Sequence, residues 1–311
     1  MVITVTINPA MDRVIKIEKF RQNVTNRIQK QFKCVGGKGT HVSINLSLMG
    51  IRSIALGVVM GLTGEDIIKE LSAYDIDLRF IRLNEGSSRT NYVLVDAEGN
   101  SSLISEKGEL MEQNIIERLV RQYEDVIGSG DTVVISGDAS NQRDTSLQDR
   151  LIDIALSHKA RFCLDASGEH LAAGVRRGPF LIKPNLDELG FLYGKELSGE
   201  KDILAALRQV HEAGAENIVA SCGAEGSYAL LGDRLYRVNS APVEVKNTVG
   251  CGDALLSGII AGFEMKLNDV DNLRQATAIA AATAMNESTV GFDPEAAQEL
   301  ITGIEVTELR F

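Results

Sequence analysis

The stretch NTVGCGDALLSG, residues 247–258, sets two glycines and a carboxylate directly ahead of an apolar run. An acid in the first turn of a helix can be a simple cap, because the helix dipole is positive there. The residues after Asp253 are apolar and small on nearly every side, which predicts a helix buried all round. Gly250 and Gly252 leave backbone N–H groups free to face an anion. The pattern therefore indicates that Asp253 acts as a base, that is, as a proton acceptor, beside an anion site.

Five further polar clusters each follow a short apolar run. They are Asn8 with Asp12, Gly137 with Asp138, Asp165, KPNLDE at 183–188 and SCGAEG at 221–226. Each cluster alone is typical of a turn or a cap. In an open α/β sheet, however, ligands bind beyond the carboxyl ends of the strands. We therefore expect these clusters to share one site with the GCGD segment.

The elements that must position these residues alternate along the chain. Buried strands are predicted at 2–7, 53–59, 132–136, 161–166, 180–183 and 217–221. Between them lie amphipathic helices such as 64–74 and 200–213, the first with Thr63 and Asp66 as a capping box. The alternation predicts an α/β fold with a parallel sheet and helices on both faces.

Two stretches break this rhythm and are typical of hairpins. They are 14–20 with 30–35, and 90–96 with 101–106, the second pair joined by a Gly99-Asn100 turn. We expect them to form a small separate sheet that acts as a lid. The prediction is a single domain, 1–311, with lid strands inserted from about 12–35 and 87–106.

Composition narrows the classes of protein. Of the 311 residues 44% are hydrophobic and 24% are charged, as in ordinary globular proteins. The net charge of -11 argues against a nucleic acid or an anionic membrane as a partner, since either needs a basic surface. The four cysteines and four histidines show no metal-site spacing, and no targeting or membrane-spanning segment stands out. We therefore expect a cytoplasmic protein with reduced thiols.

Two segments resemble known phosphate-binding motifs but lack residues that those motifs require. VGGKGT at 35–40 is not a Walker A loop, because Gly39 follows Lys38 and Phe32 stands where the leading glycine belongs. GCGDAL at 250–255 lacks the third glycine of a dinucleotide fingerprint and comes late in the chain. A nicotinamide enzyme is therefore disfavoured.

An ordered set of motifs remains: GGKG at 36–39, RTN at 89–91, KPNLDEL at 183–189 and NTVGCGD at 247–253. With them the chain resembles the ribokinase/PfkB carbohydrate kinase family over nearly its whole length. The opening TVTINPAMDR and the late AMNESTVGF are most similar to its tagatose-6-phosphate kinase and 1-phosphofructokinase branch. The resemblance implies a ribokinase-like three-layer α/β/α fold with a β-sheet lid. It also implies phosphoryl transfer from MgATP to a sugar hydroxyl, and it leaves a homodimer through the lid open.

The resemblance assigns roles to single positions. Asp253 matches the catalytic base, and the backbone N–H groups of Gly250, Cys251 and Gly252 match an anion hole for the transferring phosphoryl group. The positions that match ATP contacts are Lys183, Asn185, Glu188, Ser221, Gly223, Gly226 and, near adenine, Asn286. Glu188 also matches a magnesium position that acts through water. The alternative is that Glu188 has no ligand and simply lies in the first turn of an ordinary amphipathic helix.

The sugar side is assigned in the same way. Asp12 and Gly37 match positions that contact sugar hydroxyls. The groups that match the substrate-phosphate site are Arg27, Lys38, Arg89 and Asn91. Arginine suits such a site, because its planar fork can hold a phosphate through two hydrogen bonds.

Two substrate-site positions depart from the pattern. His41 stands where the family usually has asparagine, and an imidazole cannot reproduce the paired donor and acceptor of an amide. Asp138 stands in SGDAS, where relatives carry a serine near the substrate phosphate. At about 5 Å and an effective dielectric constant of about 20, a carboxylate costs about 3 kcal/mol per unit of phosphate charge. Either Asp138 turns away as a cap, or the phosphate lies elsewhere or is absent.

Three functions stay open from the sequence. The first is an ATP-dependent kinase of a ketohexose monophosphate, with tagatose 6-phosphate ahead of fructose 1-phosphate. The second is a kinase of an unphosphorylated sugar or a nucleoside, which His41 and Asp138 favour. The third is a sensor of nucleotide or sugar without catalysis, against which the intact Asp253 and GCG segment speak.

Overall fold

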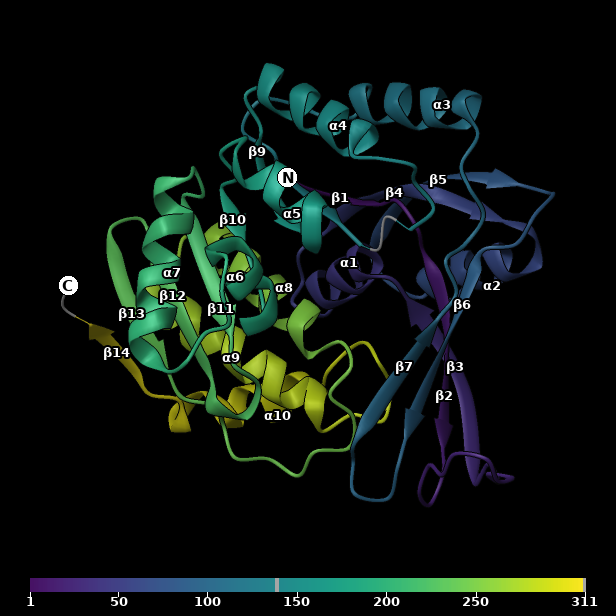
Figure 1. Cartoon of the computed structure of the whole chain (residues 1–311). Coiled ribbons are helices and arrows are strands. Elements are labelled where there is room, and N and C mark those ends of the chain that lie inside the picture. The colour runs from purple at the N-terminus through teal and green to yellow at the C-terminus, as the bar shows by residue number, and fades with distance from the viewer. Residues whose placement is uncertain (138–139, 310–311) are drawn as a thin grey trace.

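A ten-stranded sheet, sheet A, forms the centre of the computed structural model, which describes residues 1–137 and 140–309 (Figure 1). Its strand order is β14-β13-β12-β11-β10-β9-β8-β1-β4-β5. The run from β11 to β5 is parallel, and β12, β13 and β14 add antiparallel strands at one edge. The strands are β1 (Val2–Thr6), β4 (Ser53–Met60), β5 (Ile76–Leu83), β8 (Thr132–Ser136), β9 (Arg161–Asp165), β10 (Leu181–Ile182), β11 (Asn217–Ser221), β12 (Ser227–Leu231), β13 (Arg234–Val238) and β14 (Val306–Leu309).

Helices cover both faces of sheet A. One hydrophobic core contains side chains of α3 to α7, and a second, on the other side of the sheet, contains side chains of α1, α8 and α9. The helices are α1 (Lys38–Leu48), α2 (Gly61–Leu71), α3 (Gln113–Glu124), α4 (Ser146–Ser157), α5 (Gly168–Val175), α6 (Leu186–Tyr193), α7 (Glu200–Glu212), α8 (Cys251–Glu264), α9 (Asp269–Ala284) and α10 (Pro294–Leu300), with 3₁₀ turns at Gly223–Glu225 and Ile301–Gly303. In the described part of the chain no helix is long and apolar enough to cross a membrane.

The chain forms these elements for simple reasons. The VITVT segment of β1 is buried at every position, as a central parallel strand must be, and its β-branched residues suit a pleated surface. Helix α8 is buried from Asp253 to Gly262, which confirms the expectation from its composition. Gly258 lets α9 approach closely, because a Cβ there would lie 2.5 Å from the Ala276 Cα. The three-layer α/β/α fold is therefore as predicted.

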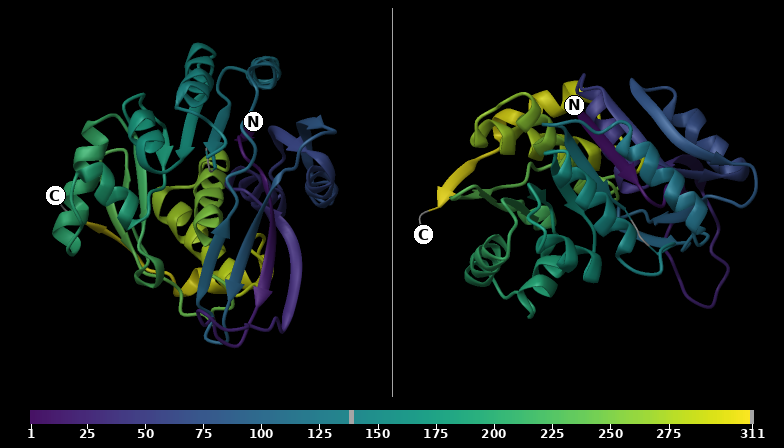
Figure 2. Two further views of the ribbon diagram at one scale, coloured as in Figure 1. Left: turned by 45° about the vertical axis from the view of Figure 1, so that its right-hand side comes forward. Right: turned by 90° about the horizontal axis from the view of Figure 1, so that it is seen from above.

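The smaller sheet B has the order β3-β2-β6-β7. It projects from the body of the molecule beside the elements formed by the N-terminal half of the chain (Figures 1 and 2). Its strands are β2 (Ala10–Lys16), β3 (Lys30–Gly36), β6 (Arg89–Val95) and β7 (Ser101–Ser105). The two hairpins join through a parallel β2–β6 pair, in which Asp12 lies opposite Asn91. The predicted lid sheet is present, and its inner end meets the carboxyl end of β1.

Several boundaries differ from those predicted. Helix α2 begins at Gly61 after an N-cap at Met60 without a side-chain cap, so the capping box of Thr63 and Asp66 is wrong. The first lid strand starts at Ala10 and ends at Lys16, because the chain then leaves the sheet for a long loop at 17–29. β10 has two residues instead of four. β5, β12, β13 and β14 were not predicted, and Asp138 lies outside the described residues.

Candidate active site

The N-terminus of α8 forms the centre of the site. Its N-cap Gly250 has φ 89°, and a Cβ there would lie within 2 Å of the Thr289 carbonyl oxygen. Glycine is therefore required at this position by its backbone conformation and by the close approach of the 286–291 turn. The N–H of Ala254 makes the first helical hydrogen bond, to the Gly250 carbonyl at 2.9 Å. Ahead of it, the Cys251 N–H donates to the Thr248 carbonyl at 3.4 Å, and the N–H groups of Gly252 and Asp253 precede the helical ladder.

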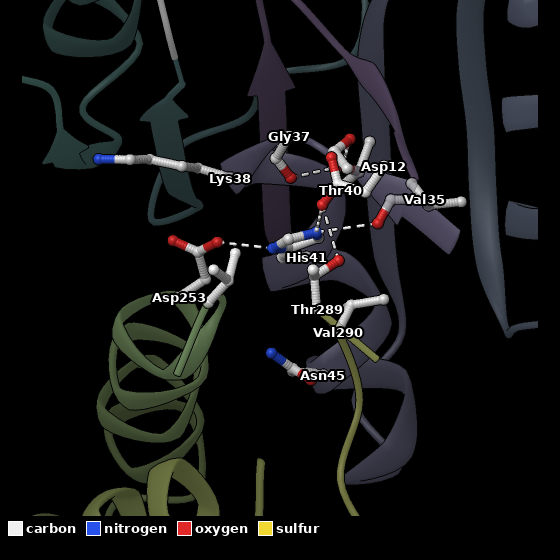
Figure 3. Close-up of polar contacts among 12 residues, drawn as sticks. Asp12, Val35, Gly37, Lys38, Thr40, His41, Asn45, Asp253, Thr289 and Val290 are labelled. Carbon is white, nitrogen blue, oxygen red and sulfur yellow. Dashed lines mark hydrogen bonds and ion pairs between the residues drawn. The ribbon is translucent and has the colours of Figure 1, made fainter. Parts of the chain in front are cut away.

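Asp253 lies in the first turn of α8 and is bonded to His41 of α1 (Figure 3). The Nδ1 of His41 is 2.6 Å from Asp253 Oδ2, and its Nε2 is 2.9 Å from the Val35 carbonyl oxygen. Burial alone lowers the pKa of an imidazole, but the hydrogen bond and charge of Asp253 outweigh it and raise the pKa of His41. The departure from asparagine thus places a basic side chain directly on the predicted base.

Lys38, the first residue of α1, points toward the carboxyl end of β9. Its Nζ is 2.8 Å from Asp165 Oδ1. Burial opposes the charge of Lys38, but the negative charges of Asp165 and Asp253 raise its pKa overall. Burial likewise opposes the charge of Asp165, whose pKa Lys38 and Lys183 nevertheless lower. Both side chains are therefore charged at neutral pH.

The lid contributes a chain of buried polar side chains. Asp12 Oδ1 accepts a hydrogen bond from Asn91 Nδ2 at 2.8 Å, and Oδ2 accepts one from the Thr289 hydroxyl at 2.7 Å. Ser105 in turn donates to Asn91 Oδ1 at 2.7 Å. His41 lies next to this chain, with Nε2 4.0 Å from Asp12 Oδ2. The predicted sugar-side residues Asp12, Asn91 and His41 are thus brought together.

The two predicted phosphate arginines lie in different environments. Arg89 is buried at the start of β6, where Nε donates to the Asn8 carbonyl at 3.0 Å and Nη1 to Ser105 Oγ at 2.8 Å. It therefore fixes the end of β1 against the lid. Arg27 is exposed in the 17–29 loop at the free end of the lid (Figure 1), so the structure does not bring it to the site.

A cavity of about 640 Å³ opens on the other side of the α8 N-terminus. Its walls are apolar side chains of α9 and the 241–248 segment, and its floor includes Cys251 and Gly252. The predicted nucleotide residues Asn185, Ser221, Gly223 and Gly226 also line it.

Lys183 is not among the side chains that line this cavity, but it lies beside Gly252, which does line it. A Cβ on Gly252 would lie 3.2 Å from the Lys183 Nζ, so this ammonium group faces the helix mouth. Burial and the charge of Asp253 raise the pKa of the neighbouring Cys251 thiol to about 12. The thiol therefore stays neutral and adds no negative charge beside the anion site.

Glu188 and Asn185 form the capping box of α6. Glu188 N donates to Asn185 Oδ1 at 2.8 Å, Asn185 N donates to Glu188 Oε2 at 3.0 Å, and Ser167 Oγ donates to Glu188 Oε1 at 2.6 Å. Glu188 therefore has a structural role in the first turn of α6, as the alternative to a magnesium role predicted. Its carboxylate also lies close enough to Lys38 to raise the pKa of that amine further.

Asn286 is not among the side chains that line the cavity. Its Oδ1 accepts a hydrogen bond from Ser288 N at 3.2 Å, and its Nδ2 donates to the Gly291 carbonyl at 3.4 Å. It stabilises the 286–291 turn, which carries Thr289.

Comparison with known proteins decides the family. Residues 3–296 match the pfkB family of carbohydrate kinases. The chain belongs to the pfkB family. It is 29% identical over 309 residues to the 1-phosphofructokinase of Bacillus subtilis, and 30% identical over 312 residues to a tagatose-6-phosphate kinase of Staphylococcus epidermidis. Each alignment covers 99% of this chain and all of the relative.

Solved structures agree on the fold. A phosphofructokinase-2 from Escherichia coli superposes with a TM-score of 0.89 at 24% identity, over 97% of this chain and 98% of the other. A putative phosphofructokinase from Staphylococcus aureus has a TM-score of 0.81 at 28% identity, over 99% of both chains. The resemblance to the carbohydrate kinases that the motifs indicated is thereby confirmed.

Sequence reasoning missed several groups of this pfkB site. Asp165 stood in a polar cluster but received no role, and Ser105, Ser167 and Thr289 were not singled out. Thr289 lies in the AMNESTVGF segment, whose similarity to relatives was the available signal. The hydrogen bond between His41 and Asp253 joins residues 212 positions apart, and no local pattern announces it.

Replacing Gly250 by Ala tests the tight approach at the α8 N-cap. A positive φ costs about 1–2 kcal/mol for a residue with a Cβ, and displacing the Thr289 backbone adds about 1–3 kcal/mol. Gly194→Ala is the matched control, because Gly194 has φ 84° and ψ 11°, close to the φ 89° and ψ -12° of Gly250, and no described atom lies within 4 Å of a Cβ there. Urea denaturation should show a larger loss in the free energy of unfolding for Gly250→Ala. Equal losses would contradict the close approach.

Proposed function

We propose that this carbohydrate kinase transfers the γ-phosphoryl group of ATP to a hydroxyl of a ketohexose monophosphate and forms a ketohexose bisphosphate. The observation that carries the proposal is the position of Asp253. It lies at the helix mouth between the polar chain of the lid and the 640 Å³ cavity, which is lined by four of the predicted ATP residues, Asn185, Ser221, Gly223 and Gly226. A hydroxyl held by the lid side and a phosphate held by the cavity side would meet at this carboxylate.

The step needs positioning and charge more than covalent help. The sugar hydroxyl oxygen forms a bond to the γ-phosphorus, the bond from that phosphorus to the bridging oxygen breaks, and ADP leaves with the electron pair. The hydroxyl proton passes to Asp253. The N–H groups of Gly250 and Gly252 and the Lys183 ammonium would stabilise the charge on the transferring group, and the Cys251 N–H would join them by leaving its 3.4 Å contact with the Thr248 carbonyl. Stabilisation of this type is worth several kcal/mol.

Magnesium fits the carboxylates near the cavity. Asp165 Oδ2 is buried without a hydrogen-bond partner among the described residues, and a cation would satisfy it. Both Glu188 oxygens already accept hydrogen bonds, so Glu188 suits contact through water. Among residues 1–137 and 140–309, no group of three His, Cys, Asp or Glu side chains forms a metal cage of its own. These residues would therefore hold a magnesium ion that arrives with ATP and neutralises phosphate charge.

The relatives' names support two substrates, tagatose 6-phosphate and fructose 1-phosphate. The second candidate function is a kinase of an unphosphorylated sugar. His41 and the engagement of Arg89 with Asn8 and Ser105 favour it. ADP release should be measured with MgATP and both phosphates, fructose 6-phosphate, free sugars and nucleosides. Turnover on a ketohexose phosphate supports the proposal, and turnover on unphosphorylated compounds alone contradicts it. ATP binding without turnover on any of them would favour the sensor.

Asp253→Asn tests whether the carboxylate is a base or a cap. General-base catalysis contributes about 10²- to 10⁴-fold, so kcat should fall by that factor while ATP affinity stays unchanged. Asp293→Asn is the control, because Asp293 caps α10 and asparagine caps a helix about as well as aspartate. Steady-state kinetics with calorimetric ATP titration checks both variants. A near-normal kcat in Asp253→Asn would remove the assigned base.

Arg89→Ala tests the substrate phosphate. A hydrogen bond to a charged group is worth about 1.5–3 kcal/mol, so the KM for the phosphorylated sugar should rise by about ten- to a hundredfold. The KM for ATP in the same variant is the control for damage to the lid. An unchanged sugar-phosphate KM would count against this role.

We also propose that two copies of the chain pair through their lids. Apolar side chains are exposed there in the 17–29 loop and on β7: Phe20, Val24, Ile28, Leu103 and Ile104. A second lid would cover such side chains and remove their apolar surface from water.

Light scattering after size exclusion tests this pairing. The unaltered chain should elute as a dimer, and Phe20→Glu combined with Ile28→Glu should give a monomer. Leu156→Glu on α4 is the control, because Leu156 is also exposed but lies away from the lid. A monomeric unaltered chain would rule the pairing out.

A further inference from the structure

Both ring nitrogens of His41 face hydrogen-bond acceptors (Figure 3). The Val35 carbonyl can only accept, so Nε2 must carry a hydrogen. An ionised Asp253 can also only accept, so Nδ1 must carry a second hydrogen to make the 2.6 Å contact. A neutral imidazole has one N–H and would leave one of these two buried contacts unsatisfied.

We infer that His41 is a doubly protonated positioning residue that locks the Asp253 carboxylate by Oδ2 and leaves Oδ1 to receive the proton of the substrate hydroxyl. This inference rests on the proposed function, because it concerns the same base. His41 keeps both of its protons throughout the transfer. The proton that leaves the hydroxyl goes to Asp253 Oδ1, which points away from His41 (Figure 3).

The surroundings of His41 favour a cation. The carboxylates that face it are Asp253 from α8 and Asp12 from β2. Lys38, on the same helix as His41, is already neutralised by Asp165. The Cys34 thiol on β3 stays neutral, because burial raises its pKa. His41 is 3% exposed, so water does not screen these charges. One buried cation between two buried carboxylates is the arrangement that electrostatics favours.

The packing of α1 against α8 holds the pair in register. One turn further along both helices, Asn45 Nδ2 is 3.5 Å from Ser257 Oγ, and Ser257 donates to the Asp253 carbonyl at 2.6 Å. The backbone of Asp253 is thus tied on one side and its Oδ2 on the other. The carboxylate has one orientation, which is what a base aimed at a single hydroxyl requires.

The charge has a consequence for pH dependence. At high pH His41 loses a proton, one of its two contacts becomes repulsive, and the lock fails. The raised pKa of His41 places this loss above the usual range for histidine. Activity should therefore have a basic limb set by the deprotonation of His41.

Nitrogen NMR of histidine-labelled protein tests the protonation state without any substrate. The three other histidines, His158, His170 and His211, are assigned by replacing each with Asn, and the remaining signal belongs to His41. At pH 7.5 both nitrogens of His41 should have imidazolium shifts. A bare, unprotonated Nδ1 would mean that the proton resides on Asp253 and would overturn the inference, whatever the kinase assays give.

The pH profile of kcat/KM separates this role from a merely structural one. His41→Asn keeps an amide donor toward Asp253 but removes the titrating charge, so the basic limb should disappear. His211→Asn is the matched control, because its imidazole is hydrogen-bonded to a backbone carbonyl, that of Ala215 at 2.8 Å, and not to Asp253. An unchanged profile shape in His41→Asn, with a lower plateau alone, would overturn the inference.

Discussion

The close contact of α1 with α8 is the constraint on which the site depends. Both helices start at the carboxyl edge of sheet A, and both are buried against the same core. Their first turns therefore bring Lys38, His41 and Asp253 to one point, where the lid strands and the nucleotide-side loops also end. Gly39 lets α1 pack closely on Thr6 of β1, and Gly258 lets α8 pack closely on α9, so both helices can lie deep in the core. Without that packing the three charged groups would have no common location.

Charge is organised locally in a chain that is acidic overall. The net charge is -11, yet the centre of the site alternates cations with carboxylates: Lys38 with Asp165, and His41 with Asp253. Buried ions are tolerated only when each has a partner. The paired groups hold one another in place. The N–H groups at the start of α8 and the Lys183 ammonium group face the space between these two pairs. The result is a fixed field at the point where phosphoryl charge develops, which is the main requirement of the proposed reaction.

Much of the fold followed from the sequence, for identifiable reasons. Buried β-branched strands such as VITVT and the apolar α8 segment carry strong local signals. The strands β12 and β13 were missed although a Gly232-Asp233 turn joins them, because the expected alternation of strand and helix masked a hairpin. In β5 the charged residues Asp77, Arg79 and Arg82 fall on both sides of the strand, and β14 carries Glu308 among four residues, so the apolar pattern of each strand is weak. Helix starts were displaced where a backbone glycine such as Gly61, rather than a capping side chain, begins the helix.

The sequence by itself determined the family, the class of reaction and the position of Asp253, because ordered motifs and an acid ahead of an apolar helix are local features. It also marked His41 as a departure. Only the tertiary structure decided what that departure does, since the bond to Asp253 joins two helices far apart in the chain. The same holds for the place of Arg27 outside the site and of Asn286 in a turn. Side-chain partners depend on how elements pack, and packing is a non-local property that residue type and spacing do not specify.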